Sequence, residues 1–453
     1  MTSPAAESFE PAVKPPAALD GLDVARQAAE RRESAVRSVF VRNAVAFTAF
    51  DVIWALGAPC VGTTVVVSYM CFMGISNAVV QIVIIAAGLL GVIQVASGKI
   101  CHGPGRRMIN FWLWVALALP WFLCGLLGAA AGSALPKWAW LPVFLAAYAA
   151  ATAAGALAGP AYGELLVDAT PPRRRGLMSA IRIALAAPMG IAGAGLVAWL
   201  IGRWAKPLNF QICFLVGSVV MMASCASMLF MRDHGESADV EAVRPSVRAS
   251  ARALLGKRKY CAYLLLYAVM TASAGFIALL IGYGKDVLGT RSEDTGTFAI
   301  AGAVGGIGVP LVALLGDRFG FRLVVLLGLL GLAASALIPV LLPASLGALL
   351  VSYACSCAAR SLAGFAGYLA IELFEDIKPA MLMAITAVLS MPLNAAVAPL
   401  GGWISDQYGP GGYHAVFIAS AALSVLCALG FHLFIHEPRN ARRPTVGLDS
   451  ARP

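Results

Sequence analysis

Long apolar runs, separated by short polar breaks, recur along the whole chain. A run of about 20 apolar residues is long enough to cross the hydrocarbon core of a bilayer as one helix. Glycine and proline inside such a run are tolerated because neighbouring helices satisfy the freed backbone groups. The pattern therefore predicts an all-α polytopic membrane protein. Twelve membrane-spanning helices are expected, at residues 43–67, 75–97, 108–130, 139–162, 176–201, 209–231, 261–283, 296–316, 323–343, 346–370, 380–403 and 414–435.

The longest internal polar break separates two sets of six runs. It carries both signs of charge, and we interpret it as a cytoplasmic linker between two lobes. The expected domains are a cytoplasmic N-terminal tail (1–40), an N-terminal six-helix lobe (41–231), the linker (232–259), a C-terminal six-helix lobe (260–436) and a cytoplasmic C-terminal tail (437–453).

Composition agrees with a membrane protein. Hydrophobic residues make up 60% of the chain and charged residues only 12%, whereas a soluble domain has about 45–50% apolar residues. The net charge of +10 first suggests an anionic partner such as nucleic acid, but its distribution argues against one. Lys and Arg concentrate in alternate breaks, which is the pattern of cytoplasmic loops. We therefore expect a multi-pass protein of the inner (plasma) membrane with both termini cytoplasmic.

The two halves of the chain repeat each other. The octet that begins at Glu164 and contains Asp168 matches the octet that begins at Glu372 and contains Asp376. A second repeat, at one common spacing, pairs Gly74 with Gly289, Gly105 with Gly320, and Arg107 with Arg322. Two six-helix halves in the same order indicate a parallel repeat about an axis along the membrane normal, which is typical of alternating-access transporters.

The loop after the second span of each half carries a family resemblance. The first half reads Gly98-x-x-x-His102-Gly103-Pro104-Gly105-Arg106-Arg107, and the second reads Asp317-Arg318-Phe319-Gly320-Phe321-Arg322. With twelve spans in two sets of six, the chain resembles the major facilitator superfamily (MFS), whose loop reads Gly-x-x-x-Asp-Arg-x-Gly-Arg-Arg. His102 and Gly103 replace the family's Asp and Arg in the first half, so that half lacks the carboxylate that the family uses in its gate contact.

The resemblance implies a gating role for these loops and for the acidic octets. The glycines permit a tight turn, and the basic residues stay on the cytoplasmic side. The alternative is that the charged residues form solvated surface pairs, which contribute little. The expected gating residues are Gly98, Gly105, Arg106, Arg107, Asp317, Arg318, Gly320, Arg322, Glu164, Asp168, Glu372 and Asp376.

Asp51 and Arg360 are the central candidates inside the spans. A charge near the bilayer midplane is costly unless it is paired, neutralised or facing water. Asp51 could therefore carry a coupling proton, or it could be structural and bonded to neighbouring groups. Arg360 cannot discharge itself and has only small residues one turn away, so it suits an anionic ligand. The resemblance places both in the central cavity, where a salt bridge between them is one hypothesis.

The remaining candidates are weaker. Arg182 is interpreted as structural, either snorkelling to the interface or pairing with Glu164. Tyr148 and Tyr267 lie on polar-aromatic helix faces that could line a ligand or serve helix packing. Trp54 and Asn394 are further candidates for substrate contact.

These observations predict a secondary active transporter for a small polar, anionic organic solute, with proton symport as the preferred hypothesis. The alternatives are an efflux pump for hydrophobic or drug-like compounds, a sugar:cation symporter, and a non-transporting sensor. We expect no enzyme activity, cofactor or metal, because neither the five histidines nor the ten cysteines have metal-ligand spacing. The expected partners are the substrate, protons and the lipid bilayer, without nucleic acid, and the protein is expected to be a monomer.

Overall fold

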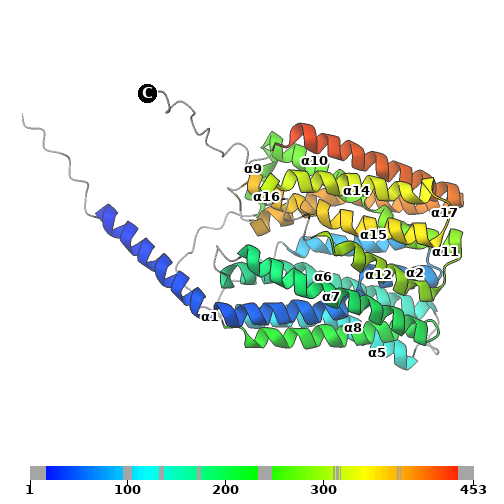
Figure 1. Ribbon diagram of the computed structural model, residues 1–453, viewed down its shortest axis with the longest axis horizontal. Helices are drawn as coiled ribbons and strands as arrows, with labels where there is room; N and C mark the ends of the chain where they lie inside the picture. The colour runs from blue at the N-terminus through cyan, green and yellow to red at the C-terminus, as the bar shows by residue number, and fades with distance from the viewer. Residues whose placement is uncertain are drawn as a thin grey trace, which may run out of the picture.

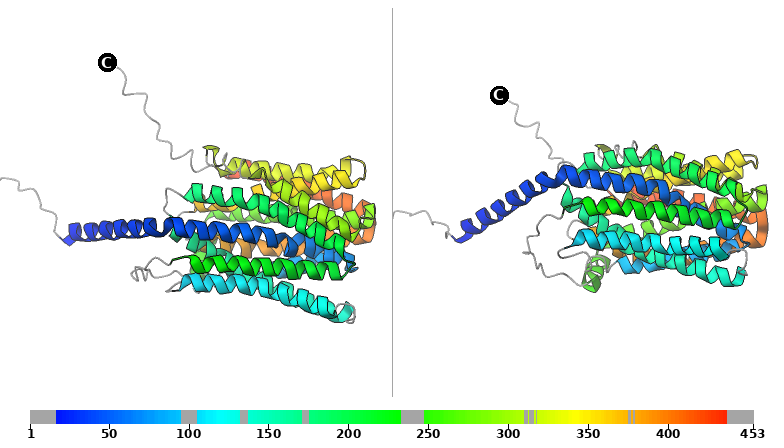
Figure 2. Two further views of the ribbon diagram at one scale, coloured as in Figure 1. Left: turned by 60° about the horizontal axis from the view of Figure 1, so that its bottom comes forward. Right: turned by 90° about the horizontal axis from the view of Figure 1, so that it is seen from below.

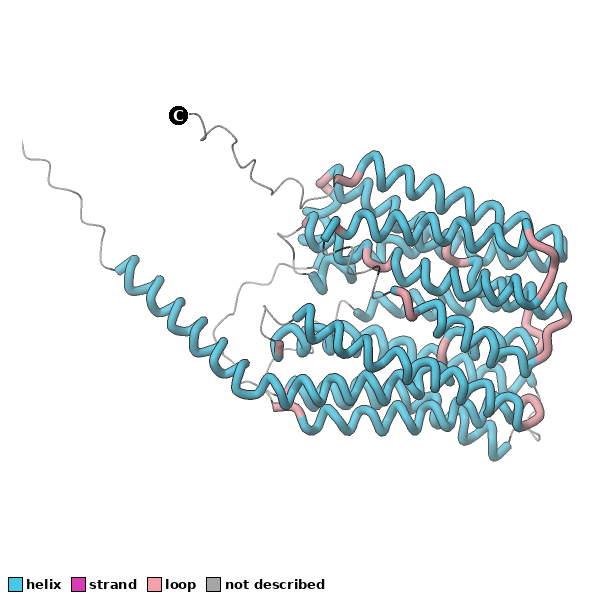
Figure 3. Tube along the Cα trace, in the orientation of Figure 1, coloured by secondary structure: helices cyan, strands magenta, loops and turns pink. Residues whose placement is uncertain are grey.

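The structure of the chain is a computed structural model. It describes residues 17–94, 105–131, 137–170, 175–232, 247–309, 312, 316, 318–374, 377 and 379–436. Every regular element in these residues is a helix, without any strand (Figure 3). The predicted all-α fold is therefore confirmed.

The helices form two side-by-side groups whose axes run nearly parallel (Figures 1 and 2). The first lobe contains α1 (Ala17–Val61), α2 (Thr63–Phe72), α3 (Asn77–Leu89), η1 (Leu90–Ile93), α5 (Arg106–Ala131), α6 (Lys137–Ala169), α7 (Arg175–Arg203), α8 (Leu208–Cys225) and η3 (Ala226–Phe230). The second lobe follows α9 (Val247–Leu255) and contains α10 (Arg258–Ser273), α11 (Phe276–Leu288), η4 (Ser292–Asp294), α12 (Thr295–Gly306), α14 (Phe321–Leu341), α15 (Leu346–Ala363), α16 (Ala366–Leu373) and α17 (Pro379–Phe434).

Nine helices in the described part of the chain are long and apolar enough to cross a membrane, so the protein is a multi-pass membrane protein. The predicted runs 75–97 and 296–316 overlap α3, with 13 residues, and α12, with 12, and each run also includes residues outside the described part of the chain. The last two runs share α17, which has 56 residues and a non-helical bend at Gly409 (φ 54°, ψ −135°). The count of twelve spans stays a prediction.

The glycines that repeat between the two halves occupy equivalent turns. Gly74 and Gly289 have φ of 84° and 66°, and Gly105 and Gly320 have φ of 86° and 96°. Backbone in this left-handed region is accessible to glycine at little cost, whereas other residues are strained there. The sequence repeat therefore reflects a repeated backbone geometry, as expected for a duplicated bundle.

Packing within each lobe follows the same scheme. In the first lobe α1 packs on α7 and α8, and α5 packs on α6 and α8. In the second lobe α14 packs on α15 and α17, and α10 packs on α17. The lobes meet where α3 packs on α17, α7 on α12 and α2 on α11.

The N-terminal part of α1 projects from one end of the bundle (Figure 1). The opposite end carries α2, α11 and the turn at Gly289, and we call this opposite end the distal end. Hydrogen bonds between described residues of the two lobes include Thr64 Oγ1 to Tyr353 Oη at 2.7 Å, Gln81 Nε2 to the Gly275 carbonyl at 3.4 Å, and a network at Asn77 described below. The distal end is thus a closed contact between the lobes.

Candidate functional site

Asp51 lies in a charged triad inside the first lobe, which we call the Asp51 triad. Its members are Asp51 of α1, Tyr162 of α6 and Arg182 of α7. Arg182 Nε donates to Asp51 Oδ2, and Tyr162 donates its hydroxyl hydrogen to Asp51 Oδ1 at 2.9 Å. A second guanidinium nitrogen of Arg182 donates to Tyr162 Oη at 3.1 Å. The side chains of Arg182 and Asp51 are only 13% and 20% exposed, so each charge depends on the other for compensation.

This geometry corrects two sequence-based hypotheses. Asp51 pairs with Arg182 and not with Arg360. Arg182 is bonded to Asp51 and Tyr162 and so does not snorkel to the interface; the predicted partner Glu164 has a side chain outside the described residues. Asp51 and Arg182 are 131 residues apart in sequence. Hydrophobic periodicity alone does not reveal which faces of α1 and α7 meet.

Aromatic rings surround the Asp51 triad. Trp54 packs edge-on against Trp114 with ring centroids 4.6 Å apart, and it stacks on Phe50 at 5.4 Å. Phe47 contacts the Tyr162 ring edge-on at 5.4 Å. Such apolar surroundings lower the local dielectric and strengthen the attraction between Asp51 and Arg182. The predicted substrate residue Trp54 therefore lies in this cluster.

Arg360 occupies a different environment, on the face of α15 that looks toward the first lobe. Tyr353, Cys357 and Arg360 follow one another at helical spacing. Tyr353 is hydrogen-bonded to Thr64 of the first lobe at 2.7 Å, which orients this face. Arg360 is near enough to Tyr148 of α6 and Tyr267 of α10 for electrostatic interaction. Two further predicted substrate residues, one from each lobe, therefore lie within electrostatic range of Arg360.

The Arg360 side chain is exposed, and no residue that the structure describes forms a hydrogen bond or ion pair with it. Asn394, also predicted to contact substrate, donates to Thr271 Oγ1 at 2.9 Å. Thr271 lies one turn beyond Tyr267 and donates to its carbonyl at 3.0 Å. Asn394 therefore packs against the helix that presents Tyr267. We call Arg360, Tyr148, Tyr267 and Asn394 the Arg360 site.

Helix breaks accompany this site. The first span is interrupted between α1 and α2 at Gly62, and α10 and α11 are separated at Ala274 and Gly275. The break between α15 and α16 at Gly364 and Phe365 follows directly after the helical turn of Arg360. Interrupted membrane helices are typical of transporter binding sites, because the freed backbone groups then line a cavity.

The predicted gating residues that the structure describes lie at the end of the bundle opposite the distal end. Arg107 donates to the carbonyls of Leu229 and Met231 at 3.3 and 2.6 Å, at the end of η3. Arg322 donates to the His432 carbonyl near the end of α17 and lies 3.1 Å from its Nδ1. Equivalent arginines therefore bind the last turn of the final helix in their own lobes, where a cation is favourable.

The other gating residues are only partly described. Gly105 and Gly320 form the positive-φ turns, Arg106 begins α5, and Arg318 is exposed with its guanidinium 5.4 Å from the Phe319 ring. Glu372, half-buried, lies at the end of α16. A gating role for these residues stays a prediction. Gly98, Asp317, Asp376 and the side chains of Glu164 and Asp168 lie outside the described residues.

Sequence reasoning missed a second polar cluster at the distal end. Asn77 at the start of α3 and Asp406 of α17 are hydrogen-bonded across the lobes, 329 residues apart in sequence. Asp286 of α11 and Tyr413 of α17 complete the cluster. The available signal was that Asp286 and Asp406 are acidic residues at the ends of apolar runs. That position is equally common for unpaired surface charges.

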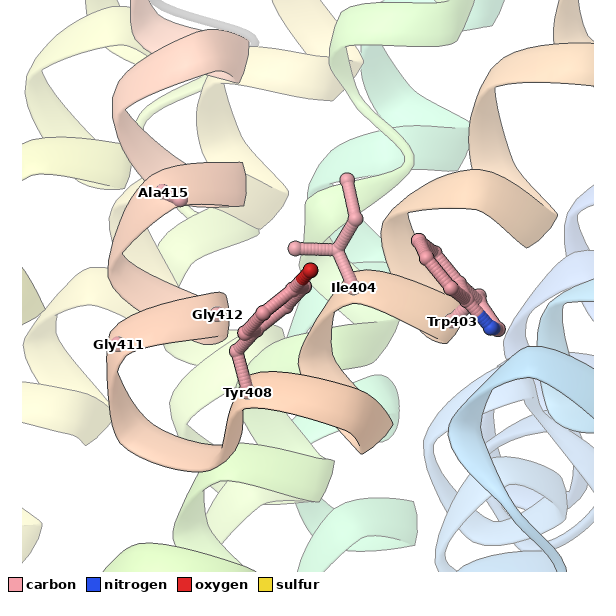
Figure 4. A pocket seen from close by; sticks show the side chains of 6 residues that line it. All are labelled: Trp403, Ile404, Tyr408, Gly411, Gly412 and Ala415. Carbon is pink, nitrogen blue, oxygen red and sulfur yellow. The ribbon is translucent and has the colours of Figure 1, made fainter.

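An apolar groove also lies at the distal end, on α17 around the bend at Gly409 (Figure 4). Its volume is about 610 Å³, and it is lined by Trp403, Ile404, Tyr408, Gly411, Gly412 and Ala415. It contains no charged residue, and Trp403 and Tyr408 are 51% and 65% exposed. Exposed Trp and Tyr at a bundle end are typical of the membrane–water interface. This groove is therefore separate from the Arg360 site. No group of three or more His, Cys, Asp or Glu that could hold a metal is present among the described residues.

The sequence profile of the Major Facilitator Superfamily matches residues 118–374 and 297–451, which is more than half of the chain. A search of curated protein sequences finds no match.

Solved structures of transporters share the fold. A D-xylose–proton symporter superposes with a TM-score of 0.65 at 14% identity, covering 88% of this chain and 99% of its own. A variant of the nucleoside transporter NupG gives 0.62 at 14% identity, covering 86% and 100%. A variant of the E. coli fucose:proton symporter FucP gives 0.57 at 13% identity, covering 88% and 100%. From the profile match and the two-lobed helical fold, the chain belongs to the Major Facilitator Superfamily.

Proposed function

We propose that the protein is a secondary active transporter that moves a small polar, anionic organic solute by alternating access between its two lobes. Arg360 provides the positive charge that binds the solute, and Asp51 carries a coupling proton. The protein resides in the inner membrane with both termini in the cytoplasm, because Lys and Arg concentrate at that side.

The different states of the two intramembrane arginines support this proposal most. Arg182 is neutralised by Asp51 inside the first lobe, whereas Arg360 is exposed between the lobes without a partner among the described residues. A guanidinium at this depth needs an anion or water around it. An anionic solute that enters between the lobes satisfies Arg360 and contacts both lobes at once, which is what alternating access requires.

The Asp51 triad supports proton coupling. Arg182 Nε and the Tyr162 hydroxyl both donate to the Asp51 carboxylate, so each of its oxygens accepts a hydrogen bond in this conformation. Protonation of Asp51 removes the charge that holds Arg182 and leaves Arg182 bonded to Tyr162 alone. Loading a proton therefore changes the contacts between α1 and α7. This is a local change that can bias the equilibrium between two arrangements of the lobe.

A sugar:proton symporter is the second candidate. Two of the structural neighbours are named as sugar–proton symporters, and the Arg360 site also offers the hydroxyls of Tyr148 and Tyr267 and the amide of Asn394. Hydroxyl and amide groups suit a neutral polyol as well as an acid. The two candidates differ in whether Arg360 must carry a charge for the solute to bind.

Thermal unfolding of the purified protein in detergent tests this difference. The probes are benzoate, succinate, gluconate, xylose, uridine and choline. A ligand that binds the folded state raises the midpoint of unfolding. We expect a rise with one or more of the anions, which Arg360→Ala abolishes and Arg360→Lys weakens. The matched control is Arg203→Ala, which removes an exposed arginine at the end of α7 and should leave the rise unchanged. A rise with xylose or uridine that survives Arg360→Ala would instead favour neutral-solute transport.

A further inference from the structure

The contact between the lobes at the distal end centres on the carboxylate of Asp406. Asp406 Oδ1 accepts from the Asn77 backbone N–H at 3.0 Å and from Asn77 Nδ2 at 2.8 Å. Asp406 Oδ2 accepts from the Ala78 N–H at 2.9 Å. These backbone groups belong to the first turn of α3, where N–H groups have no partner within the helix and the helix dipole favours an anion. A carboxylate of the second lobe therefore caps a helix of the first.

Two further groups of the second lobe enclose the Asn77 amide. Nδ2 donates to Tyr413 Oη at 2.7 Å and lies 3.3 Å from Asp286 Oδ2. Tyr413 donates its hydroxyl hydrogen to Asp286 Oδ2 at 2.6 Å. Asn77 and Tyr413 are 6% and 1% exposed, so these bonds are shielded from competing water. Lys285 Nζ, 3.6 Å from Asp286 Oδ1, partly balances the negative charge.

Glycines allow the helices to come close enough for these bonds. A Cβ on Gly282 would lie 2.3 Å from Asn77 Oδ1 and 2.9 Å from Tyr413 Oη. A Cβ on Gly402 would lie 2.7 Å from the Ala78 Cα. Between α12 and α7, a Cβ on Gly296 would lie 2.3 Å from the Ala198 Cα. Any side chain at these three positions would push the lobes apart at the distal end.

We propose that Asp406, Asn77, Asp286 and Tyr413 form a latch that holds the distal mouth of the protein shut. We call it the Asp406 latch. The inference rests on the proposed function in one respect, because alternating access requires a second state in which the distal end opens. In that state α3 and α17 must separate, so Asp406 leaves the first turn of α3 and every bond from Asn77 to the second lobe breaks. The latch thus sets how often the distal-open state is visited.

Cys71 provides a native reporter of this opening. It lies in α2, is 2% exposed, and is close enough to Asp286 and Asp406 to interact with both electrostatically. A bulky, hydrophilic maleimide can reach it only when the distal mouth opens. The starting protein keeps Cys71 and has the other nine of its ten cysteines replaced by alanine or serine. Labelling in detergent without substrate gives a rate, and labelling after denaturation gives the total.

Asp406→Asn is the main variant, because it keeps the shape of the side chain but loses the charge and one acceptor. The variant loses a charge-assisted hydrogen bond that exists only in the closed state, so it destabilises the closed state relative to the open one. We therefore expect the rate of Cys71 labelling to rise about tenfold or more. Gly282→Ala should raise the rate similarly by displacing Asn77 and Tyr413. Asp294→Asn is the matched control: it removes a carboxylate from the same end of the same lobe, where the Asp294 carboxylate accepts from the nearby Arg291 N–H. Its rate should stay within about twofold.

Size-exclusion chromatography identifies variants that do not fold, and Gly282→Ala keeps the test decisive if Asp406→Asn is one of them. A folded Asp406→Asn or Gly282→Ala protein that labels no faster than the starting protein would overturn the latch. So would an Asp294→Asn protein that labels as fast as Asp406→Asn, because distal charge alone would then explain the effect. The assay uses no substrate, so its outcome is independent of whether Arg360 binds an anion.

Discussion

The Asp51–Arg182 pair leads to a sharp prediction about stability. The side chains are 20% and 13% exposed, so removing one partner leaves the other charge largely desolvated. Breaking a buried pair in this way typically costs about 3–5 kcal/mol. Asp51→Asn keeps the size of the side chain and leaves the Arg182 guanidinium with Tyr162 Oη at 3.1 Å as a remaining acceptor. We therefore expect the free energy of unfolding to fall by about 3 kcal/mol.

The reverse change should cost less. Arg182→Met removes the guanidinium, but the remaining Asp51 carboxylate keeps its hydrogen bond from Tyr162 at 2.9 Å and can take up a proton, which a guanidinium cannot lose. We expect a loss of about 1–2 kcal/mol from Arg182→Met. The double variant has neither charge, so its loss should be close to that of Arg182→Met alone. The coupling energy between the two positions then equals the loss from Asp51→Asn, about 3 kcal/mol.

Reversible unfolding in mixed micelles of mild detergent and sodium dodecyl sulfate measures these four free energies. Additive effects, with a coupling energy below about 0.5 kcal/mol, would refute the reasoning, because the two charges would then not depend on each other. A larger loss from Arg182→Met than from Asp51→Asn would contradict the assignment of the guanidinium as the charge that cannot be neutralised.

Two further predictions concern the loops at the end opposite the distal mouth. Arg107→Ala removes hydrogen bonds to the carbonyls of Leu229 and Met231 at the end of η3 and should lower the free energy of unfolding by about 1.5–3 kcal/mol in the same assay. Arg318→Ala, at an exposed position, should change it by less than about 0.5 kcal/mol, and equal effects of the two variants would contradict this difference. Gly320→Ala forces a side chain into a φ of 96° and should cost about 1–2 kcal/mol. Gly411→Ala, in a helix with open space around it, should be neutral or stabilising, and a loss as large as that of Gly320→Ala would be contrary to the account.

The class of fold could be predicted from the sequence because it depends on local properties. Apolar runs set the helices, and the repeated Gly105 and Gly320 mark turns, at which the structure shows a positive φ. The presence of Asp51 and Arg360 inside spans was also evident, because an ionisable residue within an apolar run is conspicuous. Nine described helices meet the length and hydropathy expected of a span.

The partners of these charged residues could not be predicted in the same way. Asp51 and Arg182 meet because of the rotation of α1 and α7 about their axes, and Asn77 meets Asp406 because of how the two lobes dock. Neither quantity is encoded in hydrophobic periodicity, since several rotations bury a similar apolar area. Arg107 and Arg322 illustrate the same limit: the loop motif is visible in sequence, but their bonds to the ends of η3 and α17 are not.

Proton flux into proteoliposomes tests the central claim most directly. Vesicles that contain a pH-sensitive dye are diluted into buffer with one of the same anions, the sugar, the nucleoside or choline, so that the solute gradient is inward. Buffer without solute is the control, and the internal pH is recorded. The account predicts that an anion which stabilises the protein also drives a pH change, and that Asp51→Asn and Arg360→Ala both abolish it. A pH change of full size in folded Asp51→Asn protein, or one driven by neutral solutes and unaffected by Arg360→Ala, would contradict the account.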